Sequence, residues 1–111
     1  MERHGDLIAL RDALREFTTA RDWRQYHTPK NLAMAMIVEA AELVEQFQWM
    51  TPEQSMSLTP EQHAAVRDEV ADTLIYLVEL ADVLDIDLIA AARDKMAKNA
   101  VKYPVGVRSE G

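Results

Sequence analysis

The 111-residue sequence contains no cysteine, which excludes a disulfide framework and thiolate chemistry and fits a reducing cytoplasm. Its three glycines are Gly5, Gly106 and Gly111, so glycine marks no break in the interior. No apolar run approaches the roughly 18 residues of a membrane span. The charged N-terminus, MERHGDL, lacks the apolar core of a secretory signal. The sequence therefore predicts a cytoplasmic protein that does not enter a membrane.

Basic residues are also scarce, with 12 Lys and Arg against 19 Asp and Glu, a net charge of −7. Because a general nucleic-acid binder needs a basic surface, we expect no nucleic acid polymer as a partner. The 49% apolar and 28% charged content is typical of a soluble globular protein. At this length we expect one domain, residues 1–111, with an extended or disordered tail at 104–111.

Prolines and apolar spacing divide the chain into helices. The sequence three times places a threonine, a good N-cap residue, before a proline suited to the first helical position: Thr28-Pro29, Thr51-Pro52 and Thr59-Pro60. Apolar residues recur at steps of three and four between these marks, and no stretch alternates like an exposed strand. Asp87 is the expected N-cap of the last helix. The sequence predicts an all-α fold, a four-helix-type bundle with helices near residues 3–22, 29–50, 60–84 and 87–101.

Four acidic residues form two pairs with the same spacing. Glu39 and Glu42 lie in the second predicted helix, and Glu69 and Asp72 in the third. Residues three apart share a helix face, and none of these acids has a Lys or Arg three or four residues away. Like charges gathered at a core edge without basic partners favour a bound cation. Ligands that are all oxygens favour Mg²⁺, with Mn²⁺ as the usual substitute.

The histidines argue against a di-iron or di-manganese bundle, which needs Glu-x-x-His motifs. His4, His27 and His63 have no glutamate three residues before them. Mg²⁺ completes its shell with water and substrate phosphates, which points to phosphate chemistry. On spacing alone, an ordinary solvated acidic face remains the alternative.

Further motifs accompany the two acidic pairs, which are separated by residues 43–68. They are Asp22-Trp23, the run from His27 to Leu32, the run from Glu39 to Trp49, the run from Asp72 to Leu77, Lys95-Met96, and the run from Lys98 to Pro104. Together these segments, over roughly residues 7–105, resemble the MazG-like all-α nucleoside triphosphate pyrophosphohydrolases, in particular the dCTP pyrophosphatase branch.

The resemblance implies hydrolysis of a nucleoside triphosphate to the monophosphate and pyrophosphate. A pyrimidine deoxynucleotide such as dCTP or a modified dCTP would be the substrate, in cleaning of the nucleotide pool. Glu39, Glu42, Glu69 and Asp72 would hold Mg²⁺ and act as the catalytic residues. Which of them, or of the nearby acids Glu45 and Glu79, activates water stays open. The resemblance also implies a homodimer or homotetramer with pockets between subunits.

Trp49 lies seven residues after Glu42, about 10 Å along the predicted helix face, where a base could stack. The resemblance adds further substrate-binding residues, with Lys102 as a phosphate contact. Packing or capping is the alternative for several of them. The predicted set is Trp23, His27, Asn31, Trp49, Tyr76, Lys95, Asn99, Lys102 and Tyr103.

Two other functions stay open at this point. A related pyrophosphohydrolase acting on dUTP or on a phosphoribosyl-nucleotide would carry similar acidic pairs. A non-catalytic helical scaffold would need only the helix faces, and it predicts no Mg²⁺-dependent thermal shift.

Overall fold

The computed structural model describes residues 6–106, and these contain only helices, turns and connecting segments. The long helices are α1 (Leu7–Ala20), α2 (Pro29–Glu45), α4 (Pro60–Val83) and α5 (Leu88–Lys102). Two short elements lie in the connections, the 3-10 turn η1 (Arg24–Tyr26) and the one-turn helix α3 (Pro52–Ser55). The all-α prediction and the four long helices are confirmed. The predicted tail falls mostly outside the described residues, within which no helix is suited to cross a membrane.

The residues that the sequence marks as caps do start the helices. The Thr28 hydroxyl accepts a hydrogen bond from the Asn31 backbone N–H at 3.2 Å, and the Asp87 carboxylate accepts one from Ala90 at 3.0 Å. Complete capping boxes begin α3 and α4, formed by Thr51 with Gln54 and by Thr59 with Gln62. Proline at the first helical position has no N–H to leave unsatisfied. Helix starts in this chain therefore depend on local side-chain caps.

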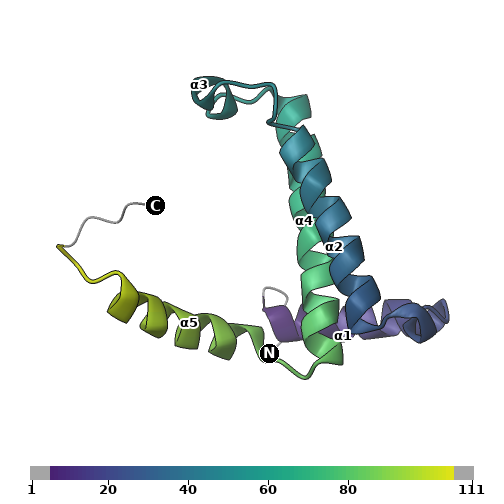
Figure 1. Ribbon diagram of the computed structural model, residues 1–111. Helices are drawn as coiled ribbons and strands as arrows, with labels where there is room; N and C mark the ends of the chain where they lie inside the picture. The colour runs from purple at the N-terminus through teal and green to yellow at the C-terminus, as the bar shows by residue number, and fades with distance from the viewer. Residues whose placement is uncertain (1–5, 107–111) are drawn as a thin grey trace.

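The antiparallel pair of α2 and α4 is the centre of the structure (Figure 1). Helix α1 crosses the end of the pair where α2 begins and α4 ends. Leu32, Val78 and Ala81 are buried, as is Thr18 of α1. The Thr18 hydroxyl donates to the Leu14 carbonyl of its own helix at 2.9 Å, so this buried polar group is satisfied. The small core thus lies at one end of the molecule.

Helix α2 ends at Glu45, so its predicted end near residue 50 is wrong. Residues 46–50 form tight turns, in which the N–H of Phe47 bonds to the carbonyl of Val44 and that of Met50 to Phe47, both at 2.9 Å. Turns with a three-residue step keep nearly the side-chain spacing of an α-helix, so the apolar pattern could not separate them. Trp49 therefore lies in a turn beyond the helix that carries Glu42.

The joint between α4 and α5 is a tight turn at Asp85, whose φ is 54°. The Ile86 N–H bonds to the Ala81 carbonyl at 2.8 Å and closes the end of α4. This left-handed conformation favours glycine, and aspartate is among the few other residues that tolerate it. The turn sets the direction in which α5 leaves.

Helix α5 extends away from the α2–α4 pair and contacts the other helices only marginally (Figure 1). Most of its apolar side chains are exposed, including Met96 at 69% and Val101 at 83%. The radius of gyration is 17.2 Å, against about 13 Å for a compact domain of this length. One chain therefore does not close a bundle around α5 by itself.

Candidate metal centre and aromatic pocket

Acidic side chains from α2 and α4 meet on the helix pair. Carboxylate oxygens of Glu39, Glu69 and Asp72 all lie within 4.8 Å of one another. Glu42 is a close neighbour of both Glu39 and Glu69. Because α2 and α4 run antiparallel, the two pairs of acids three residues apart come together across the helix interface. The structure thus brings the four predicted acids into one cluster, called the acidic cluster below.

The acidic cluster holds negative charge that its protein neighbours do not compensate. Atoms Oε2 of Glu39 and Glu69 are buried and receive no hydrogen bond from any residue in the described part of the chain. Burial, followed by the contact with Glu42, raises the pKa of Glu39 to about 7. Burial is also the main cause that raises the pKa of Glu69. Ionised carboxylates in such a place are unfavourable unless an opposite charge joins them.

The donor set of the acidic cluster fits a hard divalent cation. Every group in it is a carboxylate, the ligand type that Mg²⁺ and Mn²⁺ prefer. The two buried oxygens without donors, on Glu39 and Glu69, are the atoms that a cation would satisfy. When ionised, these carboxylates repel one another, and a bound divalent cation would offset that repulsion.

An apolar pocket, called the aromatic pocket below, opens beside Asp72. Its volume of about 350 Å³ lies in the range of small-molecule sites. The rings of Phe17 and Trp23 meet edge to face in its wall, with centroids 5.6 Å apart and planes at 67°, a favourable aromatic arrangement. Asp72 belongs to both the pocket lining and the acidic cluster, so the two sites are continuous. The lining residues are Leu14, Phe17, Trp23, His27, Asp72, Ile75, Tyr76 and Glu79.

Two polar side chains of the aromatic pocket follow Asp72 along α4. Burial is the main cause that raises the pKa of Tyr76, so its phenol stays neutral and can donate a hydrogen bond. Burial also raises the pKa of Glu79, against the opposing effect of His27 and Arg24. Among the described residues, no hydrogen bond or ion pair reaches the Glu79 carboxyl group. The pocket therefore offers a donor, Tyr76, and an acceptor, Glu79, whose side chains have no bonded partner among the described residues.

Trp23, His27 and Tyr76 lie in the aromatic pocket, whereas the other predicted binding residues do not. The Asn31 side-chain amide donates to the Tyr26 carbonyl at 3.0 Å, a local bond that supports the connection before α2. The remaining predicted residues lie outside both the pocket and the acidic cluster of their own chain, namely Trp49, Lys95, Asn99, Lys102 and Tyr103.

Trp49 is 89% exposed and lies beyond the end of α2 that is farther from α1. Helix α2 has 17 residues and is therefore about 25 Å long, which separates Trp49 from Trp23. The two tryptophans of one chain cannot enclose the same base. The α5 residues are also remote, because α5 extends away from the α2–α4 pair.

The pocket also contains residues outside the predicted set of site residues. Leu14 and Phe17 follow the apolar spacing of the first helix, but in the structure Phe17 is 45% exposed and forms part of the pocket wall. The turn between Phe17 and Trp23 passes through Asp22, which has a φ of 56°. The sequence signal for this pocket wall was the pair of aromatic residues, Phe17 and Trp23, on the two sides of the turn.

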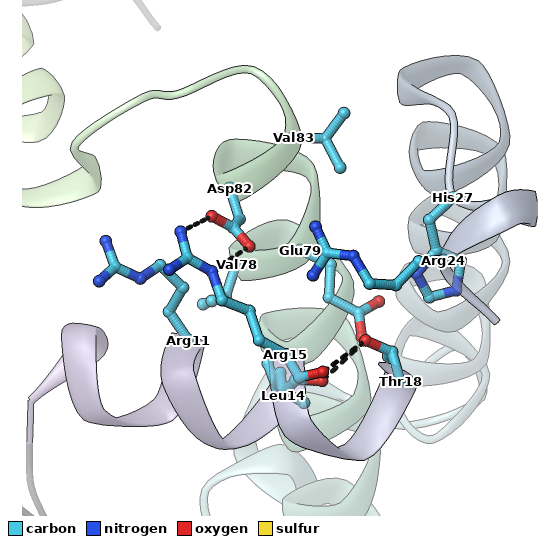
Figure 2. Close-up of a pocket in the computed structure, with 10 residues that line it drawn as sticks. All are labelled: Arg11, Leu14, Arg15, Thr18, Arg24, His27, Val78, Glu79, Asp82 and Val83. Carbon is cyan, nitrogen blue, oxygen red and sulfur yellow. Dashed lines mark hydrogen bonds and ion pairs between the residues drawn. The ribbon is translucent and has the colours of Figure 1, made fainter. Parts of the chain in front are cut away.

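A second, small pocket shares Leu14, His27 and Glu79 with the aromatic pocket (Figure 2). Its volume of about 30 Å³ suits water rather than a ligand. Beside it, the Arg15 guanidinium binds Asp82 through two hydrogen bonds, of which Nε to Oδ2 measures 2.9 Å. These bonds are the main cause that lowers the pKa of Asp82. The pair fastens α1, and with it the wall of the aromatic pocket, to α4.

Comparison with known proteins gives a consistent result. Residues 34–110 match the MazG-like family. The chain is 44% identical over 92 residues to dCTP pyrophosphatase 1 of Bos taurus, covering 81% of this chain and 54% of the relative. It is 43% identical over 91 residues to dCTP pyrophosphatase 1 of Homo sapiens, covering 80% and 54%. The chain thus spans about half the length of these curated relatives.

Among solved structures, the chain is similar to a pyrophosphatase from Archaeoglobus fulgidus. The TM-score is 0.85 at 44% sequence identity, with 94% of this chain and 97% of that chain covered. This similarity extends over α1 and α5 as well as over the helix pair that carries the acidic cluster.

Proposed function

The chain belongs to the MazG-like family, and from this premise we propose that it hydrolyses a nucleoside triphosphate to the monophosphate and pyrophosphate. The substrate is a pyrimidine deoxynucleotide such as dCTP or a modified dCTP, and the role is cleaning of the cytoplasmic nucleotide pool. The main observation in support of the proposal is that the acidic cluster and the aromatic pocket share Asp72. The names of the relatives, dCTP pyrophosphatase 1 and a pyrophosphatase, support it.

The four acids hold divalent cations, with Mg²⁺ expected and Mn²⁺ as a substitute. A cation held there would supply positive charge beside the phosphates and would acidify a nearby water molecule. Glu39, Glu42, Glu69 and Asp72 position that charge, and an acid not engaged with a cation can accept the proton from water. The triphosphate end of the substrate thus lies at the acidic cluster.

The base and sugar occupy the aromatic pocket. Phe17 and Trp23 offer ring faces and edges against which a base packs, and His27 lies in the same wall. Tyr76 lies one turn beyond Asp72, between the phosphates and the base, where its neutral phenol can donate to the sugar. The substrate therefore extends along α4 from the acids toward α1.

A second copy of the chain completes the site in a homodimer or homotetramer. Large apolar side chains of α2 stay exposed in one chain, with Ile37 at 61% and Val44 at 60%, and such surface favours association. Association also gives α5 a surface to pack against. It can bring the remote set, Trp49, Lys95, Asn99, Lys102 and Tyr103, to the substrate bound by a neighbouring chain.

The test of this function resolves the reaction products. The protein is incubated with Mg²⁺ and, separately, dCTP, 5-methyl-dCTP, dUTP and a phosphoribosyl-nucleotide. We expect dCMP and pyrophosphate in equal amounts from dCTP, with no dCDP. Release of orthophosphate, or no turnover of any triphosphate, would contradict the proposal. Preference for dUTP or for the phosphoribosyl-nucleotide would favour the related pyrophosphohydrolases. A protein that turns over no substrate and shows no Mg²⁺-dependent thermal shift would favour a scaffold.

A further inference from the structure

Glu79 lies at the end of the aromatic pocket that is farther from the acidic cluster. It follows Asp72 by seven residues on the same face of α4, a distance of about 10 Å along the helix. This is comparable with the span of a nucleoside monophosphate from its phosphorus to the far edge of its base. With the phosphates at the acidic cluster, the far edge of a pyrimidine would come near Glu79.

The Glu79 carboxyl group is partly buried without a bonded partner among the described residues. Figure 2 shows its side chain leaving α4 on the side where Arg24 and His27 lie. His27 and Arg24 oppose the rise in the pKa of Glu79, but neither bonds to it. Because a polar group removed from water costs free energy until it is paired, Glu79 is suited to receive a donor from a ligand.

We propose that Glu79 accepts a hydrogen bond from the exocyclic amino group of the base and makes the site selective for cytosine over uracil. This inference rests on the proposed function, since it assumes a nucleotide in the aromatic pocket. Carboxylates accept hydrogen bonds from the N4 amino group of cytosine. Uracil presents a carbonyl oxygen at the same position, so two acceptors would face each other and the carboxylate would stay unpaired. Selection therefore comes from rejection of the keto base as well as from binding of the amino base.

The position of Glu79 also separates it from the reaction itself. A general base must lie within hydrogen-bond reach of the attacking water, directly or through one further water. At about 10 Å from Asp72 along α4, Glu79 is too far from the acidic cluster for that role. Glu79 therefore contributes to selection of the base, whereas the acidic cluster contributes to binding and cleavage of the phosphates.

The first arm of the test compares the wild type with Glu79→Gln in the hydrolysis of dCTP and dUTP. The glutamine keeps the shape of the side chain, but its amide can donate to the uracil carbonyl. We expect the ratio of kcat/KM for dCTP to that for dUTP to fall by about 10- to 100-fold, mainly through KM. Glu16→Gln, the same change at an exposed position of α1, is the matched control and keeps the wild-type ratio.

The second arm measures binding of dCMP and dUMP by calorimetry, without turnover. The wild type is expected to bind dCMP more tightly, and Glu79→Gln to bind the two about equally. Equal binding by the wild type, or an unchanged preference in the variant, would overturn the role of Glu79 even where pyrophosphate release confirms the function. Absence of triphosphate turnover would instead contradict the function, while the binding ratio still decides the role of Glu79.

Discussion

The negative charge of Glu39 favours cation binding but destabilises the chain when no cation is bound. One of its carboxylate oxygens is buried without a donor in the described chain, and burial with the contact to Glu42 raises its pKa to about 7. In the cation-free protein at neutral pH, ionised Glu39 is therefore repelled by its neighbours. A bound divalent cation would turn the same group into a source of stability.

Replacing Glu39 with Gln should reveal this opposition in thermal unfolding. With a chelator present, Glu39→Gln should melt about 2–5 °C above the wild type, because one repelling charge is gone. With Mg²⁺ in excess, the wild type should gain stability and the variant should gain much less. Glu45→Gln, on the exposed side of the same helix, should keep the wild-type response. An unchanged Mg²⁺ shift in Glu39→Gln would remove this residue from the cation site.

At the scale of elements, an ion pair helps to fix the place of α1. Arg15 and Asp82 join α1 to α4 through two hydrogen bonds, and the Asp82 side chain is only 12% exposed. The core beneath is small. Because Leu14 and Phe17 form one wall of the aromatic pocket, the geometry of the pocket follows the position of α1.

The ion pair gives a pH dependence with a definite sign. Arg15 lowers the pKa of Asp82, so the pair stabilises the folded state above the unfolded pKa of about 4. That stability is lost as the pH falls through the lower folded pKa. Asp82→Asn should therefore reduce the free energy of unfolding at pH 7 by about 1 kcal/mol.

The difference between wild type and Asp82→Asn should shrink toward zero below pH of about 4. Urea unfolding measured across this pH range checks it. Asp68→Asn, at an exposed position of α4, is the control and should follow the wild-type curve. A difference between Asp82→Asn and wild type that stays constant with pH would show that the ion pair does not stabilise this contact.

Local signals in the sequence account for the helices and for the acidic cluster. Thr28, Thr59 and Asp87 cap the helices that they mark, because a cap needs only residues three positions away. The acids converge because two pairs with helical spacing lie on neighbouring helices. The aromatic pocket could not be predicted in this way, since it depends on the left-handed turn at Asp22, for which the usual signal is glycine. The direction of α5 depends in the same way on Asp85.

At the scale of the whole molecule, a single chain leaves much of its apolar surface uncovered. Leu32 is the one large side chain that is fully buried among the described residues. Trp49 and most apolar residues of α5 are exposed in the part of the chain that the structure describes. A second copy would bury these groups, which is the basis of the proposed shared site.

Mixing two defective chains should restore activity if each site takes its acids from one chain and Trp49 from another. Glu42→Gln should abolish turnover, and Trp49→Ala should raise KM by about tenfold through lost aromatic packing. When equal amounts of the two variants are refolded together, half of the dimers contain one chain of each variant. One of the two sites in such a dimer combines intact acids with an intact Trp49. The refolded mixture should therefore contain about a quarter of the wild-type number of high-affinity sites.

Each variant refolded alone is the control for this experiment. Sedimentation should give a mass of two or four times 12.6 kDa for every sample. A mixture that shows only the sum of the separately refolded variants would contradict a site shared between chains.

The exposed apolar face of α2 and the unsupported helix α5 also bear on the lifetime of a newly made chain. A chain without its partner presents the kind of surface by which chaperones and proteases recognise unfolded proteins. Orphan subunits would then be degraded faster than assembled ones. The amount of this protein in a cell would consequently rise more steeply than its rate of synthesis, because synthesis also determines how quickly each chain meets another.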